Sequence, residues 1–184
     1  PLEGKTALDV GCGAGLLCEP LARLGAKVTG LDASIEIISV ARDHAHASRL
    51  EIDYRVGDVQ DLDGQYDLVT SLEVIEHVAD PLRALREIHR VLKPGGVVIV
   101  TSHMFMPIHA HPWDYWRFTP EAFGLLLEPF ETTLVMANGW SLMPDTVMGV
   151  GVKGPLPDLT MERFPATAER IRRWGEHLPI DLGP

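Results

Sequence analysis

Short apolar runs alternate along the chain with segments whose apolar residues recur every three or four positions. Five such runs, each bounded by turn-forming residues, predict strands: Thr6–Val10, Lys27–Leu31, Glu51–Val56, Tyr66–Ser71 and Val97–Ser102. Three intervening segments have the helical period: Gly15–Leu24, Ile35–His46 and Pro81–Leu92. Near-continuous apolar strands that alternate with helices predict a doubly wound α/β fold, in which helices cover both faces of a mostly parallel sheet.

The third of these helices has the clearest end signals. Asp80 suits the N-cap, Pro81 suits the first helical position, and Pro94-Gly95-Gly96 is expected to stop the helix. The pattern changes after Ser102, where a loop rich in His and aromatic residues leads to a helix that opens at Thr119-Pro120-Glu121.

Two further strands are expected near Thr132–Ala137 and Thr146–Lys153, which brings the sheet to seven strands. We therefore expect one domain over residues 1–153. Residues 154–184 hold three prolines before a short amphipathic helix, Ala166–His177, and are expected to form a C-terminal appendage.

The composition narrows the choice of partners. The chain has 184 residues, of which 46% are hydrophobic and 23% charged, as in a soluble globular domain. Its net charge of −10 argues against a nucleic-acid partner, because phosphate binding requires a basic surface. No apolar stretch reaches 18 residues and no signal peptide is visible, so we expect a cytoplasmic protein away from membranes. The chain begins at Pro1, five residues before the first strand, and we expect that an N-terminal segment is missing.

Three glycines follow the first strand in the turn Asp9-Val10-Gly11-Cys12-Gly13-Ala14-Gly15. Glycine is needed where the backbone takes a positive φ or lies against a ligand. Such a turn before a helix is typical of nucleotide and nucleoside sites at the carboxyl edge of a parallel sheet. The G-x-G-x-G spacing differs from the dinucleotide pattern G-x-G-x-x-G. A disulfide between Cys12 and Cys18 would distort this turn, so both are expected to be free thiols.

Carboxylates follow the next two strands. Asp32 lies seventeen residues after Gly15, where a carboxylate accepts both ribose hydroxyls of an adenosine; NAD and S-adenosylmethionine (SAM) both supply such a ribose. After the third strand, Asp58 is positioned for the adenine amino group and Val59 for the ring face. The alternative for Asp58 is an ordinary turn residue.

Taken together, the segments ALDVGCGAG, VTGLDAS, GDVQDL, YDLVTSLEVIEHVADP and LKPGG resemble the class I SAM-dependent methyltransferases of the methyltransferase type 11 group. The first half is most similar to the O-methyltransferases of ubiquinone biosynthesis. The resemblance implies a seven-stranded, Rossmann-like sheet with its last strand antiparallel. It also implies that SAM binds, with S-adenosylhomocysteine (SAH) as product, through these positions: Asp9, Gly11, Cys12, Gly13, Asp32, Ala33, Asp58, Val59 and Leu72.

In the ubiquinone subfamily, two Glu and a His hold a divalent cation, and Glu73, Glu76 and His77 match those positions. Two carboxylates and an imidazole suit Mg²⁺ or a similar ion, which would lower the pKa of a bound hydroxyl. The same three residues are therefore the predicted catalytic group and the predicted metal ligands. The alternative is that His77 acts alone as a general base, or only caps the loop.

The connection after the fifth expected strand departs from that subfamily. His103–Pro112 is too short for the amphipathic insertion that attaches the ubiquinone enzymes to membranes, so we do not expect a polyprenyl acceptor. Its three histidines lack Cys partners and a closed ligand set, so they do not predict a zinc site: His103, His109 and His111.

The segment that follows, Pro112–Pro120, is expected to wall the acceptor pocket. Its aromatic residues suit stacking on a phenolic ring or a sugar. The predicted acceptor contacts are His111, Trp113, Tyr115 and Trp116. The alternative is that Trp116 and Phe118 only pack the loop onto the sheet.

The main hypothesis is thus a SAM-dependent O-methyltransferase that acts on a soluble small molecule, either a phenol or a sugar-like compound. Leu72-Glu73-Val74-Ile75 stands where nitrogen-methylating relatives carry Asn or Asp before Pro-Pro-Tyr, which favours a hydroxyl acceptor and leaves a carbon acceptor open. A second hypothesis is a catalytically silent SAM-binding regulatory or partner protein. An NAD-dependent oxidoreductase is disfavoured by the glycine spacing.

Overall fold

The computed structural model describes residues 2–109, 112–140, 143–155 and Arg173. The expected C-terminal helix Ala166–His177 lies outside this part of the chain apart from Arg173, as does most of the expected appendage 154–184. No described helix combines the length and the apolar character needed to cross a lipid bilayer.

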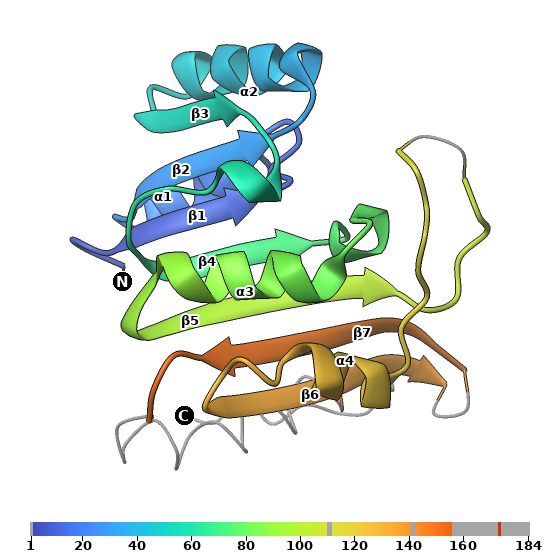
Figure 1. Ribbon diagram of the computed structural model, residues 1–184. Helices are drawn as coiled ribbons and strands as arrows, with labels where there is room; N and C mark the ends of the chain where they lie inside the picture. Colours follow the sequence, from blue (N-terminus) through green and yellow to red (C-terminus); the bar gives the residue numbers. More distant parts are fainter. Residues whose placement is uncertain (1, 110–111, 141–142, 156–172, 174–184) are drawn as a thin grey trace.

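A seven-stranded sheet runs through the molecule in the order β3-β2-β1-β4-β5-β7-β6 (Figure 1). Its strands are β1 (Thr6–Val10), β2 (Lys27–Asp32), β3 (Ile52–Val56), β4 (Tyr66–Leu72), β5 (Leu92–His103), β6 (Thr132–Trp140) and β7 (Met143–Val152). Strands β1 to β5 pair in parallel, and β7 is antiparallel to both of its neighbours, β5 and β6. The prediction of a mostly parallel, doubly wound sheet with an antiparallel last strand is confirmed.

Helices cover both faces of this sheet. They are α1 (Cys18–Arg23), α2 (Ile35–Ala47), α3 (Pro81–Val91) and α4 (Pro120–Leu126), with short 3-10 turns η1 (Val59–Asp61) and η2 (Ile75–His77). In Figure 1, α3 and α4 lie in front of the sheet and α1 lies behind it. The core is accordingly divided in two: Leu85 and Phe123 belong to the cluster under α3 and α4, and Leu21 and Ile38 belong to the cluster under α1 and α2.

Side-chain caps fix where the longer helices begin. Ser34 accepts a hydrogen bond from the N–H of Ile37, Asp80 from Arg83, and the hydroxyl of Thr119 from Ala122, each at the start of a helix. Each cap satisfies a backbone N–H that has no partner inside the helix. Because these signals are local, the starts of α2, α3 and α4 agree with the sequence.

The first helix and the fifth strand differ from their expected bounds. Helix α1 begins at Cys18 rather than Gly15, because the φ of +87° at Gly15 is left-handed and incompatible with a right-handed helical turn. Strand β5 begins at Leu92 rather than Val97. The expected stop signal there joins the sheet instead: the N–H of Gly95 donates to the carbonyl of Lys153 (2.6 Å), and the N–H of Lys153 donates to Gly96 (2.9 Å).

The carboxyl ends of the parallel strands meet along one edge of the sheet. The connection between β5 and α4 leaves from this edge and projects beyond the arrowheads of β4 and β5 (Figure 1). In doubly wound sheets ligands bind at this edge, which is therefore the expected position of the site.

Candidate functional site

The glycine turn folds back tightly after β1. The N–H groups of Gly11 and Cys12 both donate to the carbonyl of Leu31 (2.7 and 3.0 Å), which draws the turn against the end of β2. Gly11 has a φ of +71°, and a Cβ there would lie 2.2 Å from Cγ2 of Val74. Any side chain at Gly11 would therefore force the Val74 side chain to move.

Asp32 ties this turn to β2. One carboxylate oxygen accepts the N–H of Gly13 (2.9 Å) and the other accepts the N–H of Ser34 (2.9 Å). Each carboxylate oxygen has a second lone pair, so the half-buried side chain keeps acceptor capacity for a ligand's hydroxyls. The structure thus brings the predicted nucleoside carboxylate and the glycine turn together.

Asp9 lies beneath the same turn and is 4% exposed. The hydroxyl of Thr70 donates to one of its oxygens (2.6 Å), and the thiol of Cys18 lies 3.5 Å from the other. Burial raises the pKa of Asp9 to about 6, against the opposing effect of these two hydrogen bonds. The thiols of Cys12 and Cys18 are both free and buried.

The other predicted cofactor positions differ in accessibility. Asp58 and Ala33 are exposed, and Leu72 is 36% exposed at the end of β4. The N–H of Asp58 donates to the carboxylate of Asp61 (2.9 Å), which fixes the turn after β3. Val59 is 6% exposed and packs in the hydrophobic core. A role for Val59 at the adenine ring stays a prediction.

Glu73 follows β4 in a left-handed conformation, with a φ of +56°. The hydroxyl of Thr101 donates to its Oε1 (2.6 Å), and Nε2 of His103 lies 3.0 Å from its Oε2. The imidazole of His103 also has Nδ1 3.5 Å from the hydroxyl of Thr146 on β7. Sequence reasoning assigned no role to His103 or Thr101. The available signal was their position at the end of the strand that neighbours β4.

Glu76 is 2% exposed, although it lies only three residues further on. Burial is the main cause that raises the pKa of its carboxyl, and the negative charge of Glu73 adds to it. Its Oε2 has no hydrogen-bond partner within the described part of the chain.

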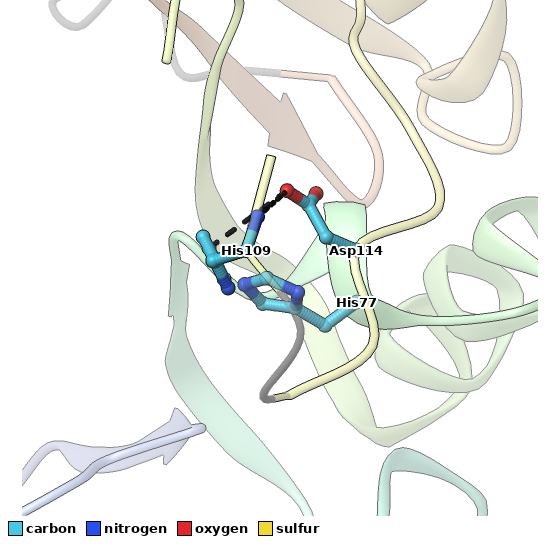
Figure 2. A group of neighbouring side chains, drawn as sticks. All are labelled: His77, His109 and Asp114. Atoms are coloured by element: carbon cyan, nitrogen blue, oxygen red, sulfur yellow. Dashed lines mark hydrogen bonds and ion pairs between the residues drawn. The ribbon is translucent and has the colours of Figure 1, made fainter. Parts of the chain in front are cut away.

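The side chain of His77 contacts the loop between β5 and α4. Its Nδ1 lies 2.8 Å from the carbonyl oxygen of Trp113, and its ring centroid lies 5.1 Å from that of His109. Among the residues that the structure describes, the three ligand atoms that lie within 4.8 Å of one another belong to His77, His109 and Asp114 (Figure 2). The predicted cation ligands Glu73, Glu76 and His77 are not gathered in this way.

An Asp–Arg pair shapes this loop. Both oxygens of Asp114 accept from the guanidinium of Arg117 (2.5 and 2.6 Å), and the side chain of Asp114 is 1% exposed. The Arg117 charge holds the pKa of Asp114 well below its usual range. Arg117 also donates to the carbonyl of Met106 (3.2 Å), so the pair joins both limbs of the loop.

The predicted aromatic wall divides into two parts. Trp113 and Tyr115 are 69% and 52% exposed. Trp116 instead stacks on buried Phe118 (centroids 6.1 Å apart, planes at 22°), and its indole N–H donates to the carbonyl of Val78 (2.9 Å). Trp116 and Phe118 thus both help to pack the loop, but Trp116 is still 41% exposed, so its contact with an acceptor stays a prediction. His111 lies outside the described residues.

A comparison with protein families shows which family has this glycine turn and these strand-end carboxylates. The family model described as a methyltransferase domain matches residues 8–100, from β1 to the middle of β5. The chain belongs to this methyltransferase family. The match contains the glycine turn, Asp32 and Glu73, and it ends just before His103.

Several curated relatives carry the name ubiquinone biosynthesis O-methyltransferase. The one from Ruegeria pomeroyi is 42% identical over 156 residues, which cover 71% of this chain and 63% of the relative. The one from Cereibacter sphaeroides is 50% identical over 171 residues, which cover 77% of this chain and 69% of the relative. The chain thus spans only part of the length of these relatives.

Solved structures agree with the fold. The phosphoethanolamine N-methyltransferase 2 of Haemonchus contortus, in complex with S-adenosyl-L-methionine, matches with a TM-score of 0.71 at 19% identity and covers 83% of this chain and 49% of that one. At this identity the likeness concerns the fold alone.

Proposed function

We propose that this chain is a SAM-dependent methyltransferase that transfers the sulfonium methyl group to a hydroxyl of a small molecule. One juxtaposition carries the proposal: the Gly11–Asp32 nucleoside site and the Glu73–His103 pair lie on adjoining strand ends of the same sheet edge. A cofactor bound at the first would direct its reactive end toward the second. The names of the two relatives support a hydroxyl acceptor.

The cofactor side of the site suits an adenosine with a charged amino-acid tail. The carboxylate of Asp32 offers its free lone pairs to the ribose hydroxyls, and the exposed Asp58 lies at the next strand end, where the adenine would be. Gly11 and Gly13 keep the backbone bare beside the methionine end, with Asp9 and Cys12 beneath it. Ala33 and Leu72 are the accessible apolar residues on either side.

SAM is an already activated methyl donor, so the residues of this chain have to align the acceptor and take up its proton. The acceptor oxygen attacks the methyl carbon, the carbon–sulfur bond breaks, and the bonding pair remains on the sulfur of SAH. We assign the proton of the hydroxyl to the carboxylate of Glu73, whose buried Oε2 lies at ion-pair distance, 3.0 Å, from Nε2 of His103. Thr101 holds the other carboxylate oxygen, so the carboxylate keeps its orientation during transfer.

The acceptor lies, in this proposal, between the Glu73–His103 pair and the exposed rings of Trp113 and Tyr115. Such rings stack on a planar phenol or on the apolar face of a sugar. Trp116 of the same loop and, by its place in the sequence, His111 are the remaining residues of the proposed acceptor wall. Glu76 and His77 support this wall from below, since the carbonyl of Glu76 accepts the N–H of Tyr115 (2.9 Å).

Calorimetric titration with SAM, SAH and NAD, followed by transfer of a tritiated methyl group to phenols and sugars, tests the proposal. We expect SAM and SAH to bind, NAD not to bind, and at least one hydroxyl compound to become labelled. Preferential binding of NAD would exclude a methyltransferase. Binding of SAM without labelling of any acceptor would favour the silent SAM-binding protein instead.

A further inference from the structure

We propose that His77, His109 and Asp114 form a binding site for a divalent transition-metal ion of the Zn²⁺ type. This set differs from the Glu73, Glu76 and His77 set that the family resemblance implies. Its members come from two segments: His77 ends η2, and the other two lie on the loop between β5 and α4. Figure 2 shows the two imidazoles beside each other with the carboxylate of Asp114 next to His109.

His77 is already oriented as a ligand. Its Nδ1 lies 2.8 Å from the carbonyl oxygen of Trp113, and a carbonyl can only accept, so Nδ1 carries the proton. The lone pair is then on Nε2, which is free for a metal. A backbone carbonyl that fixes the tautomer in this way is the usual outer partner of a metal-binding histidine.

His109 has no hydrogen bond that would compete with a metal. Its Nδ1 is buried and has no partner among the described atoms, and its Nε2 lies 3.9 Å from the nearer oxygen of Asp114, too far for a hydrogen bond. A buried imidazole nitrogen without a partner is destabilising, because it has lost its hydrogen bond to water. A bound cation would supply the missing partner.

Asp114 is held by Arg117, which donates to both of its oxygens, and the backbone N–H of His109 also donates to Oδ2 (3.4 Å). Oδ1 therefore retains a lone pair for a metal. Arg117 also offsets the negative charge of this carboxylate. The site therefore relies on its two imidazoles, which favour Zn²⁺ and similar ions over Mg²⁺. Separations of up to 4.8 Å exceed the roughly 3.3 Å between ligand atoms around tetrahedral Zn²⁺, so the loop has to close slightly on the ion.

Three protein ligands leave one position of a tetrahedral ion open, as in catalytic rather than structural zinc sites. The open position would take water or an oxygen of the acceptor, since Trp113 and Tyr115 belong to the same loop. This last step rests on the proposed methyl transfer. The binding of the ion does not.

The test is a calorimetric titration of the EDTA-treated, dialysed protein with ZnCl₂. We expect one ion per chain with a Kd in the micromolar range or below, and at least tenfold weaker binding in His109→Ala. The matched control is His44→Ala, an exposed histidine on α2, which should bind Zn²⁺ like the wild type. Binding weaker than roughly 100 μM in the wild type, or equal binding in His109→Ala, would overturn the site.

Co²⁺ provides a second measurement that does not depend on activity. Visible absorption of low-coordinate Co²⁺ that disappears in His109→Ala and Asp114→Asn supports the site. An intense thiolate-to-cobalt charge-transfer band would assign the metal to Cys12 or Cys18 and contradict it. SAM titration and methyl-transfer assays on the same preparations keep the two proposals separate. If the protein binds SAM and transfers methyl groups but does not bind Zn²⁺, only the metal site is contradicted. If it binds Zn²⁺ but transfers no methyl group, only the proposed methyltransferase activity is contradicted.

Discussion

Nε2 of His103 lies 3.0 Å from Oε2 of Glu73, where the parallel strands β4 and β5 end side by side. If this pair takes the proton of the acceptor, Glu73→Gln and His103→Asn should each lower the turnover number by roughly 10²- to 10⁴-fold. SAM affinity should change by less than about threefold, since neither residue is expected to contact the adenosine. Steady-state methyl transfer and SAM calorimetry on the same preparations measure the two effects.

The chain holds a second His–Glu pair that serves as a control. Nε2 of His89 lies 3.8 Å from Glu131, at the opposite end of the strands from the site. His89→Asn removes a comparable contact and should leave turnover unchanged. Full activity in both Glu73→Gln and His103→Asn would show that the pair takes no part in the reaction.

The backbone at Glu73 makes a separate prediction about stability. A left-handed φ of +56° costs a residue with a Cβ about 1–2 kcal/mol relative to glycine. Glu73→Gly should therefore be about 1 kcal/mol more stable than Glu73→Ala, which is the reverse of the usual order of these two residues. Urea unfolding of the two variants measures this difference. A more stable Ala variant would mean that the turn relaxes to another conformation without cost.

Gly11 and Gly13 should respond differently to the same substitution. Gly11→Ala places a methyl group 2.2 Å from Cγ2 of Val74, so it should cost roughly 2–4 kcal/mol of folding free energy. Gly13→Ala has no atom within 4 Å of the new Cβ and should cost about 1 kcal/mol, while SAM affinity falls. Thermal unfolding with and without SAM measures both quantities.

A second substitution tests the cause of the larger cost. If the methyl group of Val74 is the obstacle, Gly11→Ala combined with Val74→Ala should be less destabilised than the sum of the two single variants. Strict additivity would instead attribute the cost to the backbone of the turn.

The sequence predicted the features whose signals are local. Asp80 and Thr119 mark the starts of α3 and α4 because a cap depends on only three or four residues. The pair of Glu73 and His103 was not predicted, because it depends on how β4 and β5 align. Their register pairs Leu72 with Thr101, and this alignment brings Glu73 and His103 together just beyond that pair. Periodicity within one strand carries no information on such an alignment.

The loop between β5 and α4 shows the same limit. The aromatic residues near Trp113 form a recognisable group in the sequence, but which of them also pack onto the core depends on the residues beneath them. Phe118 is buried where it packs edge-on against Phe123 of α4, and the ring of Trp116 stacks on Phe118. Likewise, the approach of His109 to His77 joins segments more than thirty residues apart, and no spacing rule connects them.

Asp9 makes stability depend on pH in an unusual direction. Burial raises its pKa in the folded protein to about 6, above its ordinary value of 3.8, so between these values the folded state binds more protons than the unfolded state. The Asp9 contribution to the free energy of unfolding therefore falls as pH rises from about 4 to about 6, by at most about 3 kcal/mol. Asp9→Asn lacks this titration, so its stability relative to the wild type should improve over the same range and then stay constant.

Asp67 provides a control of opposite sign. Lys93 Nζ lies 2.7 Å from its carboxylate and is the main cause that holds the pKa of Asp67 well below its usual range. The unfolded state then binds more protons at low pH, so the stabilising effect of Asp67 is present above pH 4 and is lost as pH falls further. Asp67→Asn should therefore be less stable than the wild type at neutral pH and approach its free energy of unfolding at acid pH. Asp9→Asn should gain in free energy of unfolding relative to the wild type as pH rises, and lose this gain at acid pH. Urea unfolding from pH 3 to pH 8 measures both series. Parallel curves for Asp9→Asn and the wild type would mean that Asp9 ionises normally, and that the turn above it is more open to water than this structure indicates.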